Sequence, residues 1–273
     1  PEKQGRRQKK MAFQEWPEDL VKAASAHQLS QNANFEIQTE GFIQSAGQLI
    51  DPSKLTYQLL DKSEVHTGIT ITAISKNYGI WKLETSNSRV YTATDIVLAM
   101  GSGLPQFLEQ FCLPLLKLHV TSGQLSFLPS NTKLSTLECS LQYGGYLTPL
   151  IDGIQALGAS FDLSGTMKLT KKAHLHNVSL LPKEIQKLVP DSLELKGRVS
   201  QRLASQDRGP LVGDWHDTIH LFSALGSRGL TNAPLLGLVL ARKIANRPFG
   251  LDREIMRIID PHRFSIRATR TKY

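Results

Sequence analysis

The stretch SALGSRGLTNAP, residues 223–234, places Gly226 and Gly229 on either side of Arg228, between two apolar runs. The run before it, TIHLFSALG, is typical of a buried strand, and the run after it, APLLGLVLARKIAN, is typical of a helix. The stretch therefore predicts a turn from strand to helix, in which the glycines let a ligand approach the backbone closely. The free N–H groups at such a helix start attract anions. Arg228 adds either positive charge or a flat surface that stacks on a ring.

A second glycine-containing turn ends the segment TATDIVLAMGSG, residues 92–103. The segment is a continuous apolar run, which predicts a strand buried on both faces. Gly101 and Gly103 allow the chain to turn sharply after it. Ligands of open α/β sheets bind at the carboxyl ends of the strands, so Gly101 is a candidate for a position beside a ligand.

Helices and further strands alternate along the chain. In GQLIDPSKLTYQLL, Asp51 is a candidate helix cap, and Pro52 suits the first helical position. Trp16–Asp19 predicts another helix start, because a proline is followed by two acids. VHTGITITAI and GIWKLETS alternate as half-buried strands do, and HLHNVSLLPKEIQKLVPD predicts a loop followed by a helix. The whole pattern predicts a mixed α/β protein without internal repeats.

The chain has 273 residues, of which 40% are hydrophobic, enough for one large domain or two interleaved ones. Its formal net charge is +8. Residues 1–10 hold five Lys/Arg and one Glu, and residues 262–273 hold four Lys/Arg and no acid, so each end carries +4 and the body between them is neutral. The net charge therefore gives no evidence for a basic groove on the folded body. The two basic tails are expected to be solvated or to bind a polyanion.

The spacing of cysteines and histidines gives no support for a metal site. Cys112 and Cys139 lack metal-ligand spacing, which favours a reducing compartment, and we expect the cytoplasm. Four histidines lie two or four residues apart in pairs but have no suitably spaced acidic or cysteine partner. These are His174, His176, His216 and His220. The apolar run at residues 233–241 is far short of the roughly 20 residues that span a membrane, so no membrane span is expected.

An ordered series of motifs resembles one enzyme family. The stretch ALGSRGLTNAP is similar to the flavin-proximal motif near the C-terminus of FAD-dependent oxidoreductases of the D-amino-acid/glycine oxidase superfamily. Within that superfamily, it is most similar to the oxidase half of bifunctional tRNA-modification enzymes of the MnmC type. Six other segments follow the order of the family, and the likeness runs from about Trp16 to the end. These segments are GQLIDPSKLTYQLL, TATDIVLAMG, SGQLSFLP, GGYLTP, LGASFD and RLASQDRGPLVGD.

The resemblance implies an α/β (α+β mixed) fold, in which a partial FAD-binding, Rossmann-like domain is interleaved with an antiparallel-sheet substrate domain. It implies oxidation of a C–N bond by hydride transfer to FAD. In enzymes of the MnmC type, the substrate is a tRNA wobble uridine that carries a carboxymethylaminomethyl group; oxidation and hydrolysis release glyoxylate and leave the aminomethyl form. The partner would then be the anticodon region of tRNA, and the uridine must turn out of its stack to reach the flavin.

The implied domains follow one another along the chain. They are a basic tail at 1–15, an FAD-domain portion with the start of the substrate domain at 16–104, the substrate domain at 105–195, a C-terminal FAD-domain portion at 196–261 and a basic tail at 262–273.

The resemblance also assigns roles to single residues. Arg202 in QRLASQD matches an arginine that holds a substrate carboxylate, because a planar guanidinium pairs with both carboxylate oxygens. Tyr146 in GGYLTP would stand over the flavin face and line the substrate pocket. Gly101 would lie near the cofactor. The residues that would lie against the flavin ring are Gly226, Ser227, Arg228, Gly229 and Leu230. Without these roles, Arg202 is a surface ion-pair partner and Tyr146 an ordinary sheet aromatic.

Two features depart from the family pattern. The chain has no Gly-x-Gly-x-x-Gly turn to hold the FAD pyrophosphate, because Leu-Pro-Gln-Phe follows Gly103. We therefore expect a missing N-terminal dinucleotide-binding portion and a methyltransferase domain to belong to the complete enzyme. Ser122 stands where several amino-acid oxidases have arginine. Two alternatives stay open: an oxidase of free glycine or sarcosine, and a non-catalytic truncated remnant that binds no FAD.

Overall fold

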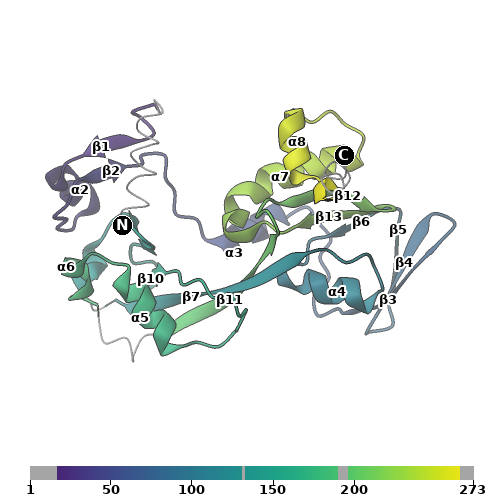
Figure 1. Ribbon diagram of the computed structural model, residues 1–273, viewed down its shortest axis with the longest axis horizontal. Helices are drawn as coiled ribbons and strands as arrows, with labels where there is room; N and C mark the ends of the chain where they lie inside the picture. The colour runs from purple at the N-terminus through teal and green to yellow at the C-terminus, as the bar shows by residue number, and fades with distance from the viewer. Residues whose placement is uncertain (1–16, 131–132, 190–195, 265–273) are drawn as a thin grey trace, which may run out of the picture. The chain divides into compact units, whose positions relative to one another are not determined.

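The computed structural model describes residues 17–130, 133–189 and 196–264. Figure 1 shows the helices and strands of these segments. Within these ranges, no helix combines the length and the apolar character that crossing a bilayer requires.

Two compact units divide the chain. Unit 1 takes residues 1–51 and 122–200, and unit 2 takes residues 52–121 and 201–273. Each unit is therefore built from two separate stretches of the sequence, as in interleaved domains. Both units combine helices with sheets, and the predicted fold class is confirmed.

Unit 1 is built on a five-stranded sheet with the order β11-β7-β10-β9-β8 (Figure 1). In this sheet, β10 pairs antiparallel with both β7 and β9, and β9 pairs antiparallel with β8. The strands are β7 (Leu118–Pro129), β8 (Leu141–Gln142), β9 (Tyr146–Leu147), β10 (Ile154–Gly158) and β11 (Lys196–Ser205). A Cβ atom on Gly145 would run into the carbonyl oxygen of Gly158, so the motifs GGYLTP and LGASFD need glycine to pack as neighbouring strands.

The core of unit 1 consists mainly of leucines from this sheet and from the helices beside it. The helical elements are η2 (Lys133–Thr136), α5 (Lys171–Ser179) and α6 (Lys183–Gln186). Ile185 is buried and Leu188 packs against the core, as the sequence predicts. The other buried members are Ala33, Leu128, Leu134, Leu137, Leu147, Leu157 and Leu181.

The helix α5 lies where the sequence predicts a loop, and that prediction is wrong. Thr170 caps α5 by accepting a hydrogen bond from the Ala173 N–H at 3.2 Å. The inward face of α5 is polar, with buried His174 and Asn177, so the apolar periodicity that marks a helix is absent. Hydrogen bonds connect this face to β7 instead, because Asn177 Nδ2 donates to the Gln124 carbonyl oxygen at 2.9 Å.

The predicted helix start at Trp16–Asp19 is also wrong. Leu20 and Val21 donate to the Pro17 carbonyl oxygen at 2.9 and 3.1 Å, which forms a single turn. The chain then enters β1 (Lys22–Ala24), which pairs antiparallel with β2 (Gly41–Ile43). The helix α2 (Ala26–Ala33) begins only after Ser25, whose side chain caps it in a capping box with Gln28. Strand pairing thus outweighs the helix-start signal at the proline.

Unit 2 contains two three-stranded sheets. One is the antiparallel sheet β3-β4-β5, made of β3 (Ile71–Asn77), β4 (Ile80–Thr85) and β5 (Val90–Ala93). The other has the order β12-β13-β6, made of β12 (Leu211–His216), β13 (Ile219–Ser223) and β6 (Ile96–Leu98). In this second sheet β12 pairs antiparallel with β13, and β13 pairs parallel with β6. The strands predicted in VHTGITITAI, GIWKLETS and TIHLFSALG are confirmed.

The described residues of unit 2 form four α-helices: α3 (Pro52–Leu59), α4 (Leu104–Gln110), α7 (Gly229–Ile244) and α8 (Arg253–Ile259). In Figure 1, α7 and α8 lie close to β12, and both make side-chain packing contacts in a cluster that includes Val212 of that strand. A larger cluster joins Leu98, Leu104, Leu108, Leu203, Leu211, Trp215, Ile219 and Leu221. These residues fix β6, β13 and the end of β11 around one core.

One prediction about burial in unit 2 is wrong. Val97, in the middle of β6, is 44% exposed, so this strand is not buried on both faces. The reason is that β6 is the edge strand of its sheet within the described residues. The helix predicted from Pro52 forms as α3, but it contains no buried residue, and Leu59 is 63% exposed.

Arg263 differs from the expectation of a solvated basic tail at residues 262–273. It is only 4% exposed and forms an ion pair with Asp207, with Nη2 2.7 Å from Oδ1. The segment from residue 265 to residue 273 lies outside the described residues, as does the N-terminal tail. The charge of Arg263 is therefore neutralised within the fold and does not contribute to a free basic tail.

His174 makes unit 1 sensitive to acid. Asn177 Nδ2 donates to Ser126 Oγ at 3.1 Å, and the same Oγ lies 2.7 Å from His174 Nδ1. Burial lowers the pKa of His174, because it disfavours the charged imidazolium. The unfolded chain takes up this proton near pH 6.5, so the stability that His174 confers is complete above that pH and is lost as the pH falls below it.

We expect His174→Gln to flatten the dependence of the urea unfolding midpoint on pH between pH 7 and pH 5. The stability at pH 7 should also fall, by roughly 1–3 kcal/mol, because a buried hydrogen bond is lost. His176→Gln is the matched control, because His176 is exposed on the same helix. An unchanged slope in His174→Gln would contradict the assignment.

Candidate functional site

Parallel pairing of β13 with β6 brings two predicted turns to one edge of a sheet. The register pairs Ile219 with Ile96 and Leu221 with Leu98, so the two strands run side by side in the same direction, and β13 continues two residues beyond the end of β6. A 3-10 turn that begins with glycine follows each strand: η1 (Gly101–Gly103) after β6, and η3 (Gly226–Arg228) after β13. The helices α4 and α7 follow these turns. Both turns thus lie at the carboxyl edge, where open parallel sheets bind ligands.

The turn after β13 is open above its glycine. Gly226 has a φ of 60°, which favours glycine, and a Cβ atom there would meet nothing within 4 Å. No side chain among the described residues caps α7, and its first turn carries no acid. Its first N–H groups therefore remain available to an anion. The other predicted residues of the turn are exposed or half-buried: Ser227, Arg228, Gly229 and Leu230.

The turn after β6 has the same character. Gly101 has a φ of 53°, and neither Gly101 nor Gly103 would bring a Cβ atom within 4 Å of another group. Met100, just before the turn, is 42% exposed. The two glycine turns thus combine backbone freedom with open space, which is what close approach of a flat ligand requires.

Ser223 is a polar group of this site that the sequence analysis did not single out. It ends β13 and is 2% exposed, and its Oγ has no hydrogen-bond partner among the described residues. A buried hydroxyl without a partner costs roughly 1–3 kcal/mol. Its position was a usable signal, because a serine ends an apolar strand directly before the glycine turn.

Arg202 reaches the same turn from another strand. Ala204 of β11 forms an antiparallel bridge with Leu225, the residue before Gly226. Arg202 precedes Ala204 by two residues, so both side chains point to the same face of β11. Arg202 Nη1 is buried, and no hydrogen-bond partner for it exists among the described residues. The structure thus brings Arg202 and the Gly226 turn together within unit 2.

Tyr146 lies in unit 1, and its role over the flavin stays a prediction. It belongs to β9, where it pairs with Gly158 of β10. Its neighbour Tyr143 has a buried hydroxyl without a partner among the described residues. Burial and the nearby Tyr146 raise the pKa of Tyr143, so this phenol is neutral at ordinary pH.

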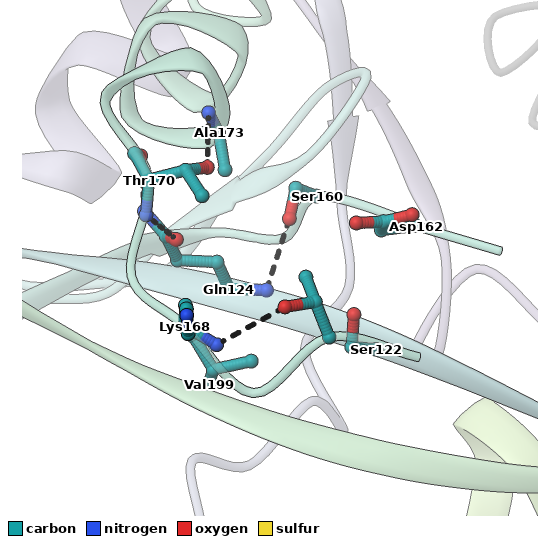
Figure 2. A pocket seen from close by; sticks show the side chains of 9 residues that line it. Ser122, Gln124, Ser160, Asp162, Lys168, Thr170, Ala173 and Val199 are labelled. Carbon is teal, nitrogen blue, oxygen red and sulfur yellow. Dashed lines mark hydrogen bonds between the residues drawn. The ribbon is translucent and has the colours of Figure 1, made fainter. Parts of the chain in front are cut away.

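A small hollow beside Gln124 in unit 1 is too small to be the substrate pocket. Figure 2 shows its polar lining, in which the Gln124 N–H donates to Ser160 Oγ at 2.9 Å. The Gln124 side chain also exchanges two hydrogen bonds with the Thr170 backbone, at 2.8 and 3.0 Å. The volume of about 20 Å³ holds little more than one water molecule. Ser122 lines this hollow, but none of the predicted flavin or substrate residues does.

His220 has a structural role within unit 2 and is held by two carboxylates. Its Nδ1 lies 2.9 Å from Asp214 Oδ1, and its Nε2 lies 3.0 Å from Asp95 Oδ1. Burial acts to raise the pKa of Asp214, but Lys243 and His220 outweigh it and lower that pKa. In the described part of the chain, no cluster of His, Cys, Asp and Glu is suited to a metal ion.

The profile of the DAO family, described as FAD dependent oxidoreductase, matches residues 2–243 of this chain. The chain belongs to this family. FAD is the cofactor of the family, and the superfamily that the motifs resemble is confirmed.

Curated members of the DAO family with similar sequences are bifunctional proteins. The tRNA 5-methylaminomethyl-2-thiouridine biosynthesis bifunctional protein MnmC of Ectopseudomonas mendocina (strain ymp) is 28% identical, over 97% of this chain and 45% of its own length. The protein of the same name from Aeromonas hydrophila subsp. hydrophila is 27% identical, over 94% of this chain and 44% of its own length. The chain thus spans less than half the length of these relatives.

Solved structures confirm the DAO fold. Glycine oxidase from Geobacillus kaustophilus matches with a TM-score of 0.66 and 15% identity, over 85% of this chain and 65% of that one. Iminodiacetate oxidase from Chelativorans sp. BNC1 matches with a TM-score of 0.69 and 17% identity, over 86% of this chain and 67% of that one. Both structures share the fold, and each also contains about a third that has no counterpart here.

The residues present fit one end of FAD. Two open glycine turns, the uncapped start of α7 and the unpartnered Ser223 hydroxyl offer a flat ring backbone approach and hydrogen-bond donors. The pyrophosphate end is different, because the sequence contains no Gly-x-Gly-x-x-Gly turn. The described turns are therefore compatible with a flavin ring, while the sequence lacks the usual glycine fingerprint for the pyrophosphate.

We expect Gly226→Ala to destabilise unit 2 by roughly 1–2 kcal/mol, because alanine is strained at a φ of 60° even where its methyl group has room. Gly237→Ala makes the same chemical change inside α7, where the methyl group meets Phe222 only at ordinary contact distance. It should instead stabilise by up to about 1 kcal/mol. Urea unfolding of both variants checks these opposite signs. Equal changes in the unfolding free energy of the two variants would contradict the positive φ of Gly226.

Proposed function

We propose that this chain provides the ring-binding and substrate-binding part of an FAD-dependent oxidase that acts on the C–N bond of a carboxymethylaminomethyl group. The observation that carries the proposal is the buried, unpartnered Arg202 Nη1, two residues from the bridge to the Gly226 turn. A buried cationic donor needs an acceptor, and a carboxylate at the end of a short amine arm would supply it.

The chain's own groups would bind and orient the arm. FAD, when bound, supplies the acceptor for the hydride that leaves the carbon next to nitrogen. Arg202 would pair with the carboxylate and fix the arm's direction, which converts a random encounter into an oriented one. The first N–H groups of α7 and the Ser223 hydroxyl would donate hydrogen bonds to polar ring atoms. Gly101 and Gly226 would leave room for the ring.

The proposed substrate is the carboxymethylaminomethyl group of a tRNA wobble uridine. The names of the two curated relatives support this choice, since both state tRNA thiouridine biosynthesis. Free glycine and sarcosine carry the same carboxymethylamine unit, so Arg202 would serve them equally. The alternative of a glycine-type oxidase therefore differs in substrate and not in the site.

We further propose that the pyrophosphate-binding unit adds to the sheet beside β6. This strand pairs only with β13 among the described residues, so its other edge is unpaired. Parallel sheets are normally covered on both faces, yet Val97 is 44% exposed. A parallel strand added here, with its helix, would place another strand end beside the Gly101 turn. We also propose that the complete enzyme contains a methyltransferase domain, because this chain spans less than half the length of its curated relatives.

We expect Arg202→Ala in the FAD-loaded enzyme to lower kcat/KM for a carboxymethylated substrate by about 100-fold, since a charge-assisted hydrogen-bond pair is worth roughly 1.5–3 kcal/mol. FAD affinity should change little. Arg198→Ala is the matched control, because Arg198 is exposed on the same strand. Glyoxylate release is measured from tRNA bearing the modified uridine, from glycine and from sarcosine. Activity on glycine but not tRNA selects the alternative, and an unchanged rate in Arg202→Ala removes its role.

We expect the 273-residue chain by itself not to bind FAD stoichiometrically. The binding unit for the pyrophosphate is absent from its sequence, and charged phosphates contribute much of a dinucleotide's affinity. Titration followed by flavin fluorescence measures this directly. The same titration is repeated after adding the strand–turn–helix portion of a relative that carries the glycine fingerprint, which should restore binding. Tight one-to-one binding by the chain alone would contradict the proposed completion.

A further inference from the structure

Arg263 is fully engaged with one turn of unit 2. Its Nε and Nη2 form a bidentate pair with Asp207, at 3.0 Å to Oδ2 and 2.7 Å to Oδ1. Its Nη1 donates to the carbonyl oxygens of Pro210 and Asp260, at 2.9 and 3.0 Å. The guanidinium also lies 4.5 Å from the centre of the Phe264 ring. One side chain from the C-terminal segment thus binds the connection between β11 and β12.

The same side chain closes that turn from within. Nη2 also donates to Ser205 Oγ at 3.1 Å and to the Gly209 carbonyl oxygen at 3.0 Å. Inside the turn, the Gly209 N–H donates to Asp207 Oδ1 at 3.1 Å. Hydrogen bonds from Arg263 hold the pKa of Asp207 well below its usual range, so the pair stays ionised. The turn from Ser205 to Pro210 therefore has one arrangement that satisfies all these groups.

Both strands that leave this turn contact the approach to the Gly226 turn. At the end of β11, Ala204 bridges to Leu225. At the start of β12, Leu211 pairs with Ser223. The segment that leads into the Gly226 turn is therefore held between two strand ends, and Arg263 determines their separation. Arg202 lies three residues before the clamped Ser205 on the first of these strands.

We propose that Arg263 is a positioning residue of the candidate site: by clamping the β11–β12 turn, it determines where Arg202 meets the Gly226 turn. The effect of Arg263 on substrate binding rests on the proposed function. Its effect on the position of the Gly226 turn does not. Lysine cannot replace this arginine, because a single ammonium cannot span the carboxylate, the hydroxyl and the three carbonyl oxygens at once. Displacements of about 1 Å in positioning groups lower rates about 100-fold.

The test compares Arg263→Lys with Arg257→Lys in the complete, FAD-loaded protein. Arg257 is exposed on α8, so its substitution changes the same chemistry without touching the turn. For Arg263→Lys we expect KM for the carboxymethylated substrate to rise about 10- to 100-fold, with a smaller change in kcat. Backbone hydrogen exchange should accelerate at residues 202–204 and 223–229, and stay unchanged in β3 and β4. Arg257→Lys should change none of these quantities.

Several outcomes would decide the inference. An unchanged KM and unchanged exchange at residues 223–229, with lower overall stability, would reduce Arg263 to a structural role. If Arg263→Lys fails to fold, Asp207→Asn is measured instead, because it keeps the size of the partner and removes its charge. If the wild-type protein oxidises no carboxymethylated amine, the proposed function fails, but the exchange data still decide whether Arg263 positions the turn.

Discussion

The parallel pairing of β6 with β13 is the contact on which the candidate site depends. Three residue pairs define its register, and the buried Leu98 and Leu221 fix it in the core. A slip of two residues would move one glycine turn by roughly 6–7 Å relative to the other. The two glycine turns would then change their relative position at the sheet edge. The chemistry proposed here therefore rests on a short strand contact.

Long apolar runs made much of unit 2 predictable from the sequence. TIHLFSALG and GIWKLETS form strands, because their patterns match the surfaces that the strands bury. The segment that forms α5 could not be predicted in the same way. Its inner face carries His174 and Asn177, and the groups that satisfy them lie about 50 residues away on β7. The helix predicted to start near Pro17 does not form for a similar reason, because the residues that follow it pair with β2.

The sequence alone pointed to candidate residues of the site, and the family resemblance assigned these residues to one flavin site. Gly101 and Gly226 were candidates because glycine after an apolar strand has a local meaning. Ser223 offered a local signal as the serine that ends an apolar strand before the glycine turn, whereas Arg263 offered none. Arg263 was counted among the charges of a tail because its partner Asp207 lies 56 residues earlier in the chain. A burial state that depends on a distant carboxylate cannot be derived from local charge patterns.

Arg263 and Arg202, two arginines near the end of β11, differ in whether their hydrogen-bond donors are satisfied within the fold. Arg263 is buried with every guanidinium nitrogen bonded, and its partner carboxylate is ionised, so it stabilises the fold without needing a ligand. Arg202 has a buried nitrogen that no described group satisfies, and the Ser223 hydroxyl is equally unpartnered among the described residues. Each such group costs roughly 1–3 kcal/mol while it stays unpaired. An anion with two acceptor oxygens would remove the cost at Arg202, and polar atoms of a flat ring would remove it at Ser223. The pattern of unsatisfied donors therefore specifies the ligand chemistry more closely than the net charge of the chain does.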